Sequence, residues 1–197
     1  MVLNKAVFLD KDGTLIPNIP YSIDPNQVHI TVDTAKALRI FAKLGYQLFI
    51  VTNQSGIARG YFSEEQVCLI AHLFREVFQS IEIHLQGFYY CPHHPEGNFP
   101  YNINNCECRK PKPGMIFQAA KEHSVDLEQS WFIGDILHDI EAGRHAGCRT
   151  ILLDNGGETE WKLSSDRLPH HIVGNLLDAA KVIAALHMPT IPLHYLL

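Results

Sequence analysis

The sequence predicts the α/β class, a parallel β-sheet flanked by helices, on three observations. Short apolar runs typical of strands alternate with segments of helical periodicity, which is the pattern of βα units around a parallel sheet. No internal repeat or low-complexity tract interrupts this alternation. With 197 residues, 46% of them hydrophobic, the chain is long enough to bury one core. We therefore expect a single domain over residues 1–197.

Six apolar runs are the expected strands. Each is short and is bounded by turn-forming or polar residues, as buried strands usually are. They cover Ala6–Leu9, Gln47–Thr52, Gly87–Tyr90, Trp131–Ile133, Thr150–Leu153 and a short segment near His171–Val173. Because helical segments separate them, we expect these strands to run parallel in a Rossmann-like sheet.

Helical spacing and end signals define the expected helices. They cover Asp33–Leu44, the segment from Ser63 to Phe78, Met115–Glu122, Asp139–Ala146 and Asn175–Leu186. The first ends before Gly45 and the fourth before Gly147, which are natural C-terminal caps. The second begins with an S-x-x-Q capping box, in which the serine and the glutamine each bind a backbone N–H group at the helix start.

Polar residues follow directly after three of the predicted strands. Ligands of open parallel sheets bind beyond the carboxyl ends of the strands, so these side chains should meet at one edge. They are Asp10, Asp12 and Thr14 after the first strand, Thr52 and Asn53 after the second, and Asp135 and Asp139 after the fourth. Carboxylates are the hard oxygen ligands that suit Mg²⁺. Together with threonine, asparagine and lysine, they predict a site for a phosphoryl group.

Simpler interpretations exist for each piece of this pattern. An Asp-Gly pair after a strand is often a plain turn, and Thr-Asn often caps a helix. An EF-hand interpretation of "DKDGT" fails because the twelfth loop position, which needs Glu, is Tyr21. The combination after several strands favours a functional site.

Four residues of one segment predict a structural zinc site. Residues 93–112 are rich in Pro, Asn, Cys and Gly and show no periodicity. Cys91 and His93 form one ligand pair and Cys106 and Cys108 a second, with twelve residues between the two pairs. Three thiolates and one imidazole make a closed tetrahedral Zn²⁺ site, and bound zinc would order the loop over residues 91–108 in place of a core. From spacing alone, His94 could replace His93.

Composition excludes several other classes of function. The formal net charge is −5 and no basic run occurs, so we expect no nucleic-acid binding. No run of eighteen apolar residues occurs, so we expect no membrane span. The start "MVLNKAVFLDKDG" lacks the pattern of a secretory signal, and the cysteine count of 5 is odd. We expect a cytoplasmic monomer without a disulfide framework, in which Cys68 and Cys148 are reduced structural residues.

Several motifs resemble those of a known family. "FLDKDGTL", "VTNQSG", "FIGDILHD" and a lysine in "CRKPKPGM" resemble the four motifs of the haloacid dehalogenase superfamily of phosphatases. More narrowly, "TNQSGIARGYF", "YYCPHHPEG" and "CECRKPKPGM" resemble the zinc-containing D-glycero-D-manno-heptose 1,7-bisphosphate phosphatases. This resemblance implies a Mg²⁺-dependent hydrolase of carbohydrate metabolism that removes the C7 phosphate of a heptose bisphosphate. The alternatives are a histidinol-phosphate phosphatase and a catalytically silent zinc-binding partner protein.

The resemblance also implies roles for individual residues. It makes Asp10 the nucleophile that forms an aspartyl-phosphate, Asp12 the general acid and base, and Thr52 and Lys110 the groups that hold the phosphoryl oxygens. Mg²⁺ is expected on Asp10, Asp135 and the backbone carbonyl of Asp12, and Zn²⁺ on Cys91, His93, Cys106 and Cys108. Substrate contacts are expected from Asn18, Ile19, Pro20, Tyr21, Thr52, Asn53, Gln54, Ser55, Arg109 and Lys110. One position departs from the family pattern: Ile136 stands where the family usually has lysine.

Overall fold

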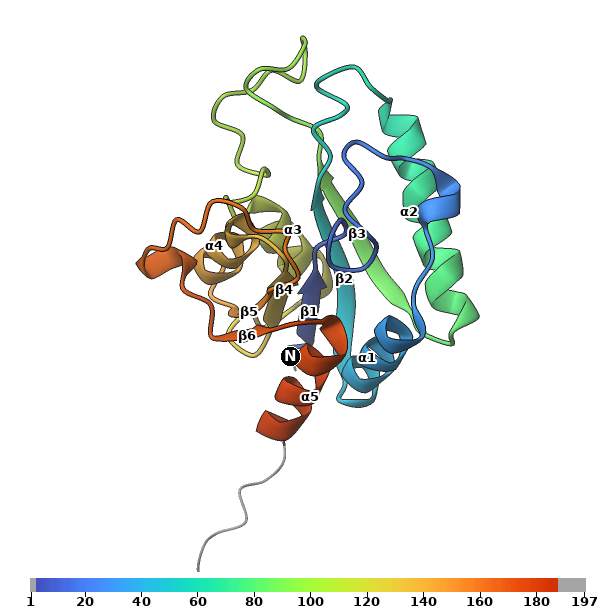
Figure 1. Ribbon diagram of the computed structural model, residues 1–197, viewed down its shortest axis with the longest axis vertical. Coiled ribbons are helices and arrows are strands. Elements are labelled where there is room, and N and C mark those ends of the chain that lie inside the picture. Colours follow the sequence, from blue (N-terminus) through green and yellow to red (C-terminus); the bar gives the residue numbers. More distant parts are fainter. Residues whose placement is uncertain (1–2, 188–197) are drawn as a thin grey trace, which may run out of the picture.

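The computed structural model describes residues 3–187 and contains one six-stranded parallel sheet (Figure 1). The strands are β1 (Lys5–Leu9), β2 (Tyr46–Asn53), β3 (Leu85–Cys91), β4 (Trp131–Gly134), β5 (Arg149–Leu153) and β6 (His171–Val173). Their order across the sheet is β3-β2-β1-β4-β5-β6. The chain therefore moves outward in one direction from β1 and then returns to build the other half, as in Rossmann-like sheets. This confirms the predicted fold class.

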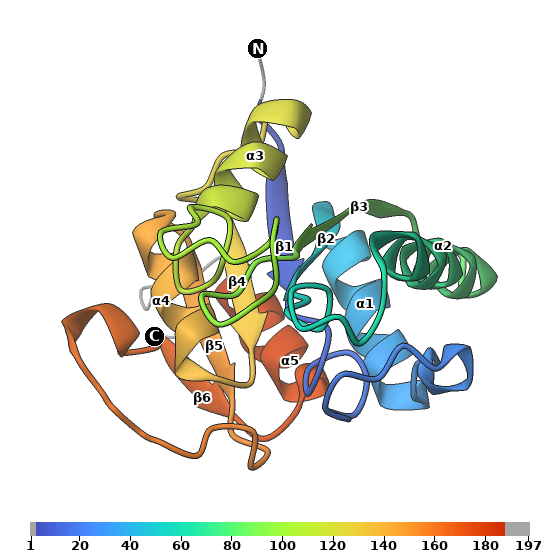
Figure 2. The same cartoon turned by 90° about the horizontal axis from the view of Figure 1, so that it is seen from above.

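Between residues 3 and 187, five α-helices cover the two faces of the sheet (Figure 2). They are α1 (Val32–Lys43), α2 (Glu64–Ser80), α3 (Gly114–His123), α4 (Leu137–His145) and α5 (Leu176–His187). Helices α1, α2 and α5 lie on one face, and α3 and α4 lie on the other. Two short 3-10 helices, at Pro25–Gln27 and Ser165–Arg167, were not predicted. Within residues 3–187, no helix combines the length and the apolar character needed to cross a membrane.

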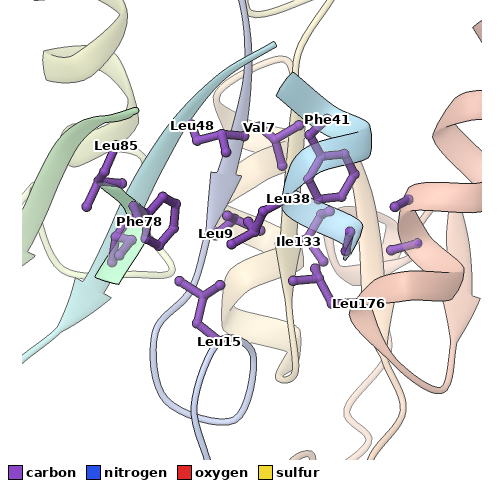
Figure 3. Packing of buried hydrophobic residues seen from close by; sticks show 14 of the residues in the cluster. Val7, Leu9, Leu15, Leu38, Phe41, Leu48, Phe78, Leu85, Ile133 and Leu176 are labelled. Carbon is purple, nitrogen blue, oxygen red and sulfur yellow. The ribbon is translucent and has the colours of Figure 1, made fainter. Parts of the chain in front are cut away.

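The sheet buries side chains on both of its faces. Val7 and Leu9 of β1 pack with Leu38 and Phe41 of α1 (Figure 3), whereas Phe8 points to the other face. All five of these side chains are fully buried. A strand covered on both sides reads as a continuous apolar run, which is why the periodicity of 2 is absent from "AVFL". The end of β1 is thereby held in the middle of the core.

The predicted element ends differ from the observed ones by one or two residues. Strand β3 starts at Leu85 rather than Gly87, because its ladder with β2 continues past the apolar run. Helix α4 begins at Leu137 rather than Asp139, because Leu137 packs against the buried Ile140 and Leu152. The capping box of α2 and the glycine ends of α1 and α4 are as predicted. The terminal segment "MPTIPLHYLL", to which the sequence assigns no chemistry, lies outside the described residues.

A histidine joins the segment before β6 to β5. The backbone N–H of Thr150 donates to Nδ1 of His170 at 3.0 Å, and the backbone N–H of His170 donates to the Thr150 carbonyl at 3.0 Å. Partial burial of the ring lowers the pKa of His170, and the charges of Arg144 and Arg149 act in the same direction. Because Nδ1 accepts a hydrogen bond, the ring is neutral in the folded protein.

We predict that His170 makes the stability of the protein depend on pH. Its pKa is lower in the folded than in the unfolded chain, where it is about 6.5. The stabilisation is therefore present above about pH 6.5 and is lost as the pH falls from there toward the folded-state pKa. His170→Asn keeps an acceptor that does not titrate, so between about pH 7.5 and 5.5 its Tm should fall less than that of the wild type.

Thermal unfolding followed by circular dichroism measures this difference. His84→Asn, at an exposed histidine, is the matched control and should follow the wild type. Equal pH dependence of Tm in wild type and His170→Asn contradicts the assignment.

Candidate active site

The polar residues predicted from the sequence meet at the topological switch point of the sheet. Strands β1 and β4 are neighbours, with Leu9 in register with Ile133, and the backbone N–H of Asp10 donates to the Ile133 carbonyl at 3.0 Å. Asp10 and Asp135 therefore follow adjacent strands at the edge where α/β sheets bind their ligands.

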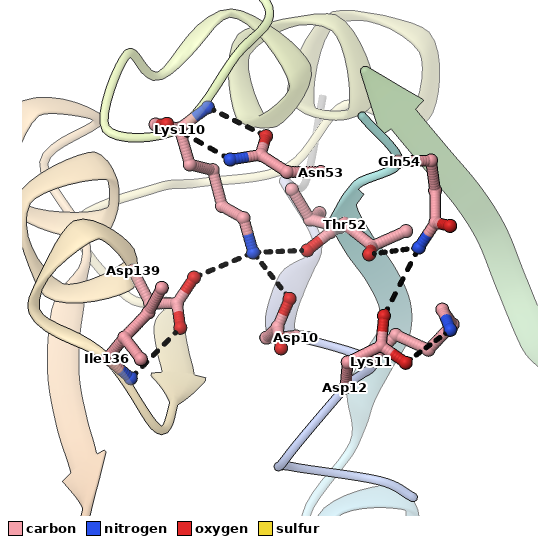
Figure 4. Close-up of polar contacts among 10 residues, drawn as sticks. Asp10, Lys11, Asp12, Thr52, Asn53, Gln54, Lys110, Ile136 and Asp139 are labelled. Carbon is pink, nitrogen blue, oxygen red and sulfur yellow. Dashed lines mark hydrogen bonds and ion pairs between the residues drawn. The ribbon is translucent and has the colours of Figure 1, made fainter. Parts of the chain in front are cut away.

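Three carboxylates and one lysine form the centre of this site, and Figure 4 shows the lysine, Lys110, with two of the carboxylates, Asp10 and Asp139. Asp10, Asp135 and Asp139 are 6%, 2% and 0% exposed, and one ligand atom from each lies within 4.8 Å of the other two. The Lys110 ammonium lies 2.5 Å from Asp10 Oδ1 and 2.6 Å from Asp139 Oδ1, and it donates to the Val51 carbonyl at 2.9 Å. Burial alone would lower the pKa of Lys110, but the charges of Asp10 and Asp139 raise it above its ordinary value. The lysine therefore stays charged.

The carboxylate cluster fits a divalent cation by charge and by its unpaired oxygen. With all three carboxylates ionised, the single ammonium leaves two negative charges uncompensated in a buried position. Burial raises the pKa of Asp135 to about 8, and the neighbouring charges of Asp10 and Asp139 add to the shift. Among the described residues, Asp135 Oδ2 has no hydrogen-bond partner. Oxygen ligands with this charge suit Mg²⁺.

Asp12 lies apart from this cluster. Its carboxylate accepts a hydrogen bond from Gln54 Nε2 at 3.2 Å and pairs with the buried Lys11 ammonium at 2.5 Å (Figure 4). Gln54 also donates to Thr52 Oγ1 at 2.9 Å. Burial raises the pKa of Asp12, while the positive charge of Lys11 lowers it, and the balance is a raised value. Asp12 and Asp10 thus occupy different environments: Asp12 pairs with Lys11 and Gln54, whereas Asp10 pairs with Lys110.

A cavity of about 260 Å³ opens in front of these groups. Its lining includes every predicted substrate residue except Arg109, namely Asn18, Ile19, Pro20, Tyr21, Thr52, Asn53, Gln54, Ser55 and Lys110. Ile136, at the position of the family lysine, also lines it. The half-buried Arg109 instead donates to the His93 carbonyl at 3.1 Å, beside the cysteine cluster. The two predicted substrate loops, residues 18–21 and 52–55, therefore face one space, and Arg109 lies outside that lining.

The side chain of Asn53 is engaged by the backbone of Lys110. Asn53 Nδ2 donates to the Lys110 carbonyl at 3.0 Å, and the Lys110 N–H donates to Asn53 Oδ1 at 3.0 Å (Figure 4). This paired contact attaches the loop that contains Lys110 to the end of β2. In this structure, Asn53 positions the lysine, a contact that the sequence pattern did not indicate.

The predicted zinc ligands come together as four converging atoms. The six distances between the sulfurs of Cys91, Cys106 and Cys108 and His93 Nδ1 lie between 2.8 and 3.7 Å. A tetrahedral zinc ion with Zn–S distances of about 2.3 Å keeps its sulfur ligands about 3.7 Å apart. One sulfur pair of the cluster has this spacing and the other two pairs are closer, and the converging atoms are of the types that bind structural zinc.

Spacing alone did not decide whether His93 or His94 is the fourth zinc ligand, and the geometry decides it. His94 turns away from the cysteines: its ring contacts Arg59 Nη2 at 3.2 Å and accepts from the Glu96 N–H at 3.1 Å. His93 is therefore the residue that joins the cysteine cluster.

Sequence reasoning missed several residues of the site. Asp139 was placed at the correct edge because it follows Asp135 by one helical turn, but nothing in the pattern indicated its pairing with Lys110. Lys11 lies between Asp10 and Asp12 in the sequence, and no role was predicted for it. Arg59, whose buried Nε has no hydrogen-bond partner among the described residues, lies in the motif "TNQSGIARGYF", but no role was assigned to it.

Comparisons with known proteins agree with this geometry. A family model described as "HAD-hyrolase-like" (HAD, haloacid dehalogenase) matches residues 107–179. The chain is 38% identical over 184 residues, 93% of its length and 99% of the relative's, to D-glycero-beta-D-manno-heptose-1,7-bisphosphate 7-phosphatase of Haemophilus influenzae. It is 44% identical to the protein of the same name from Haemophilus ducreyi, over 78% of this chain and 85% of the relative.

A solved structure has the same fold. The D,D-heptose 1,7-bisphosphate phosphatase of B. bronchiseptica, crystallised with magnesium and phosphate, matches with a TM-score of 0.74 and 25% identity, over 92% of this chain and 99% of that one. Sequence and structure thus lead to the same group of enzymes. The chain is a phosphoric monoester hydrolase and belongs to the heptose 1,7-bisphosphate 7-phosphatase family of the haloacid dehalogenase superfamily.

Proposed function

We infer that this phosphatase removes the C7 phosphate of D-glycero-D-manno-heptose 1,7-bisphosphate in a Mg²⁺-dependent reaction, with Asp10 as the covalent nucleophile. The observation that carries the inference is the buried cluster of Asp10, Asp135 and Asp139 around Lys110, at the floor of a cavity lined by both predicted substrate loops. The names of the relatives support the substrate. The reaction places the enzyme in heptose biosynthesis.

The reaction has two steps, and Asp10 and Asp12 act in both of them. In the first, an Asp10 carboxylate oxygen attacks phosphorus, the P–O bond to the sugar breaks, and Asp12 gives its proton to the leaving sugar oxygen. In the second, water attacks the aspartyl-phosphate, Asp12 takes the proton of that water, and Asp10 is regenerated with release of phosphate. The raised pKa of Asp12 supports the proton-transfer role, because its protonated form is accessible nearer to neutral pH.

The remaining groups neutralise and hold the transferring phosphoryl group. Lys110 and Thr52 bind its oxygens, and the ion pair with Asp139 keeps the lysine aimed at Asp10. The carboxylates of Asp10 and Asp135 and the backbone carbonyl of Asp12 would hold Mg²⁺, which when bound supplies positive charge to the phosphoryl oxygens. Positioning and charge account for most of the catalysis of phosphoryl transfer.

Arg109 and Arg59, which contact the neighbouring His93 and His94, are candidates for binding a second phosphate. Burial lowers the pKa of Arg109, and the charge of Arg59 adds to this effect. Two guanidinium groups whose charges act on each other are stabilised by an anion between them. Heptose bisphosphate brings that anion as its C1 phosphate. Histidinol phosphate has an amine instead, which the arginines would repel, and this favours the sugar bisphosphate over that alternative.

Zinc serves the structure of the loop rather than the chemistry. The four ligands, Cys91, His93, Cys106 and Cys108, leave no open position for substrate. Arg109 and Lys110 follow Cys108 directly, so a bound Zn²⁺ would fix the loop that presents both cations to the substrate. A silent zinc-binding protein would not require this link to a complete phosphatase site.

The proposal also covers the setting in which the enzyme works. A small-molecule sugar bisphosphate is its partner, and the acidic net charge of −5 disfavours nucleic acid. We propose a monomer that works in the cytoplasm away from membranes.

Replacement of the nucleophile should abolish turnover. Asp10→Asn keeps the shape of the side chain but removes the attacking charge, so we expect kcat to fall by roughly three orders of magnitude or more. The rate of phosphate release from heptose bisphosphate in the presence of Mg²⁺ measures kcat. Asp33→Asn, at an exposed aspartate of α1, should keep wild-type turnover. Full activity of Asp10→Asn shows that the nucleophile is another group.

Zinc should be present as one tightly bound equivalent per chain. Elemental analysis of the purified protein measures it. We expect Cys108→Ser to lose the metal and most of the turnover, because Arg109 and Lys110 lose their anchor, whereas Cys68→Ser, at an exposed free cysteine, should keep both. A folded, active wild-type sample that contains no zinc refutes the assignment.

Arg109 should act on the substrate's second phosphate. For Arg109→Met we expect the KM for heptose 1,7-bisphosphate to rise about 10- to 100-fold, the effect of a lost charge-assisted contact. The KM for heptose 7-phosphate, which lacks the C1 phosphate, should change little. Lys112→Met, at a partly exposed cation of the same segment that pairs with Glu107, is the control. An equal rise of KM for both substrates argues against this role of Arg109.

A further inference from the structure

Helix α4 begins without a capping side chain of its own. Its N-cap residue is Ile136, whose side chain cannot accept a hydrogen bond from the first turn. This turn matters to the site because it lies between two of the clustered carboxylates, Asp135 and Asp139. Asp139 Oδ2 accepts from the Ile136 N–H at 3.3 Å, but the N–H of Leu137 needs a partner from elsewhere.

Glu158 supplies that partner from the loop after β5. Its Oε2 accepts from the Leu137 N–H at 2.7 Å, and its Oε1 accepts from the Glu160 N–H at 2.8 Å. Partial burial alone would raise the pKa of Glu158, but these and neighbouring backbone N–H groups lower it below its ordinary value. An ionised carboxylate at this end of a helix is also favoured by the helix dipole.

The same loop packs directly against the carboxylate of Asp135. A Cβ atom built on Gly157 would come within 2.1 Å of Asp135 Oδ2, and one built on Gly13 would come within 1.9 Å. Asn155 Nδ2 donates to the Gly13 carbonyl at 2.6 Å, so the loop is tied to the segment after β1 as well as to α4. Residues 155–158 thus hold both flanks of Asp135.

We propose that Glu158 is a positioning residue of the cation site. By capping α4, it fixes the turn over residues 135–139 and seats Gly157 against Asp135, so that the buried carboxylate keeps the orientation that a divalent cation requires. Loss of such outer contacts typically weakens metal binding 10- to 100-fold. The inference rests on the proposed function only for the location of the cation.

Binding of Mn²⁺ to the zinc-containing protein without substrate, measured by electron paramagnetic resonance, tests this role. We expect Glu158→Ala to raise the Kd for Mn²⁺ about tenfold or more. Glu158→Gln, which keeps one acceptor oxygen, should show an intermediate Kd. Glu160→Ala, in the same loop, should bind as the wild type does, because its exposed side chain pairs with Lys162.

The outcomes distinguish a positioning role of Glu158 from a general effect on stability. They also distinguish failure of this inference from failure of the proposed function. Glu158→Ala with a lowered Tm and an unchanged Kd overturns the positioning role. If Glu158→Ala does not fold, Glu158→Gln and Asn155→Ala decide, since both should raise the Kd, and an unchanged Kd in both also overturns it. Asp135→Asn locates the ion: equal binding by this variant and the wild type overturns the proposed function and this inference together.

Discussion

The structure is organised around an excess of buried negative charge at the carboxyl ends of β1 and β4. Asp10, Asp135 and Asp139 converge within 4.8 Å, and Lys110 is the ammonium that lies between two of them. Carboxylates buried this closely are costly unless positive charge compensates them. One lysine compensates only part of this negative charge. The remaining negative charge attracts a cation, and the bound cation in turn attracts a phosphoryl group.

Several distant features follow from the need to deliver Lys110 to that position. The lysine lies on a loop without a hydrophobic core, and the cluster of Cys91, His93, Cys106 and Cys108 provides the means to order it. Asn53 then binds both the N–H and the carbonyl of Lys110, which fixes the loop to the end of β2. The opposite flank is held by Glu158 and Asn155 from the loop after β5. Rigid strands and two loops thus converge on one charge arrangement.

The fold and much of the site could be predicted from the sequence for physical reasons. Strand β1 reads as an unbroken apolar run because both faces of the sheet are covered, and the catalytic candidates follow strands because parallel strands end at one edge. The contacts that could not be predicted join residues far apart in the chain. The ion pair of Asp139 with Lys110 and the cap that Glu158 provides to Leu137 leave no local pattern, and Ile136 hid the true start of α4.

The central claim is that Asp10 and Asp135 share one divalent cation beside a phosphoryl group bound to Asp10. A crystal structure of the protein with Mg²⁺ and beryllium fluoride, which imitates a phosphoryl group on a carboxylate, tests it most directly. We expect beryllium bonded to an Asp10 oxygen, Mg²⁺ bound by Asp10 and Asp135, and the Lys110 ammonium on a fluorine. Beryllium fluoride on another residue, or Mg²⁺ bound without Asp10 and Asp135, would contradict it.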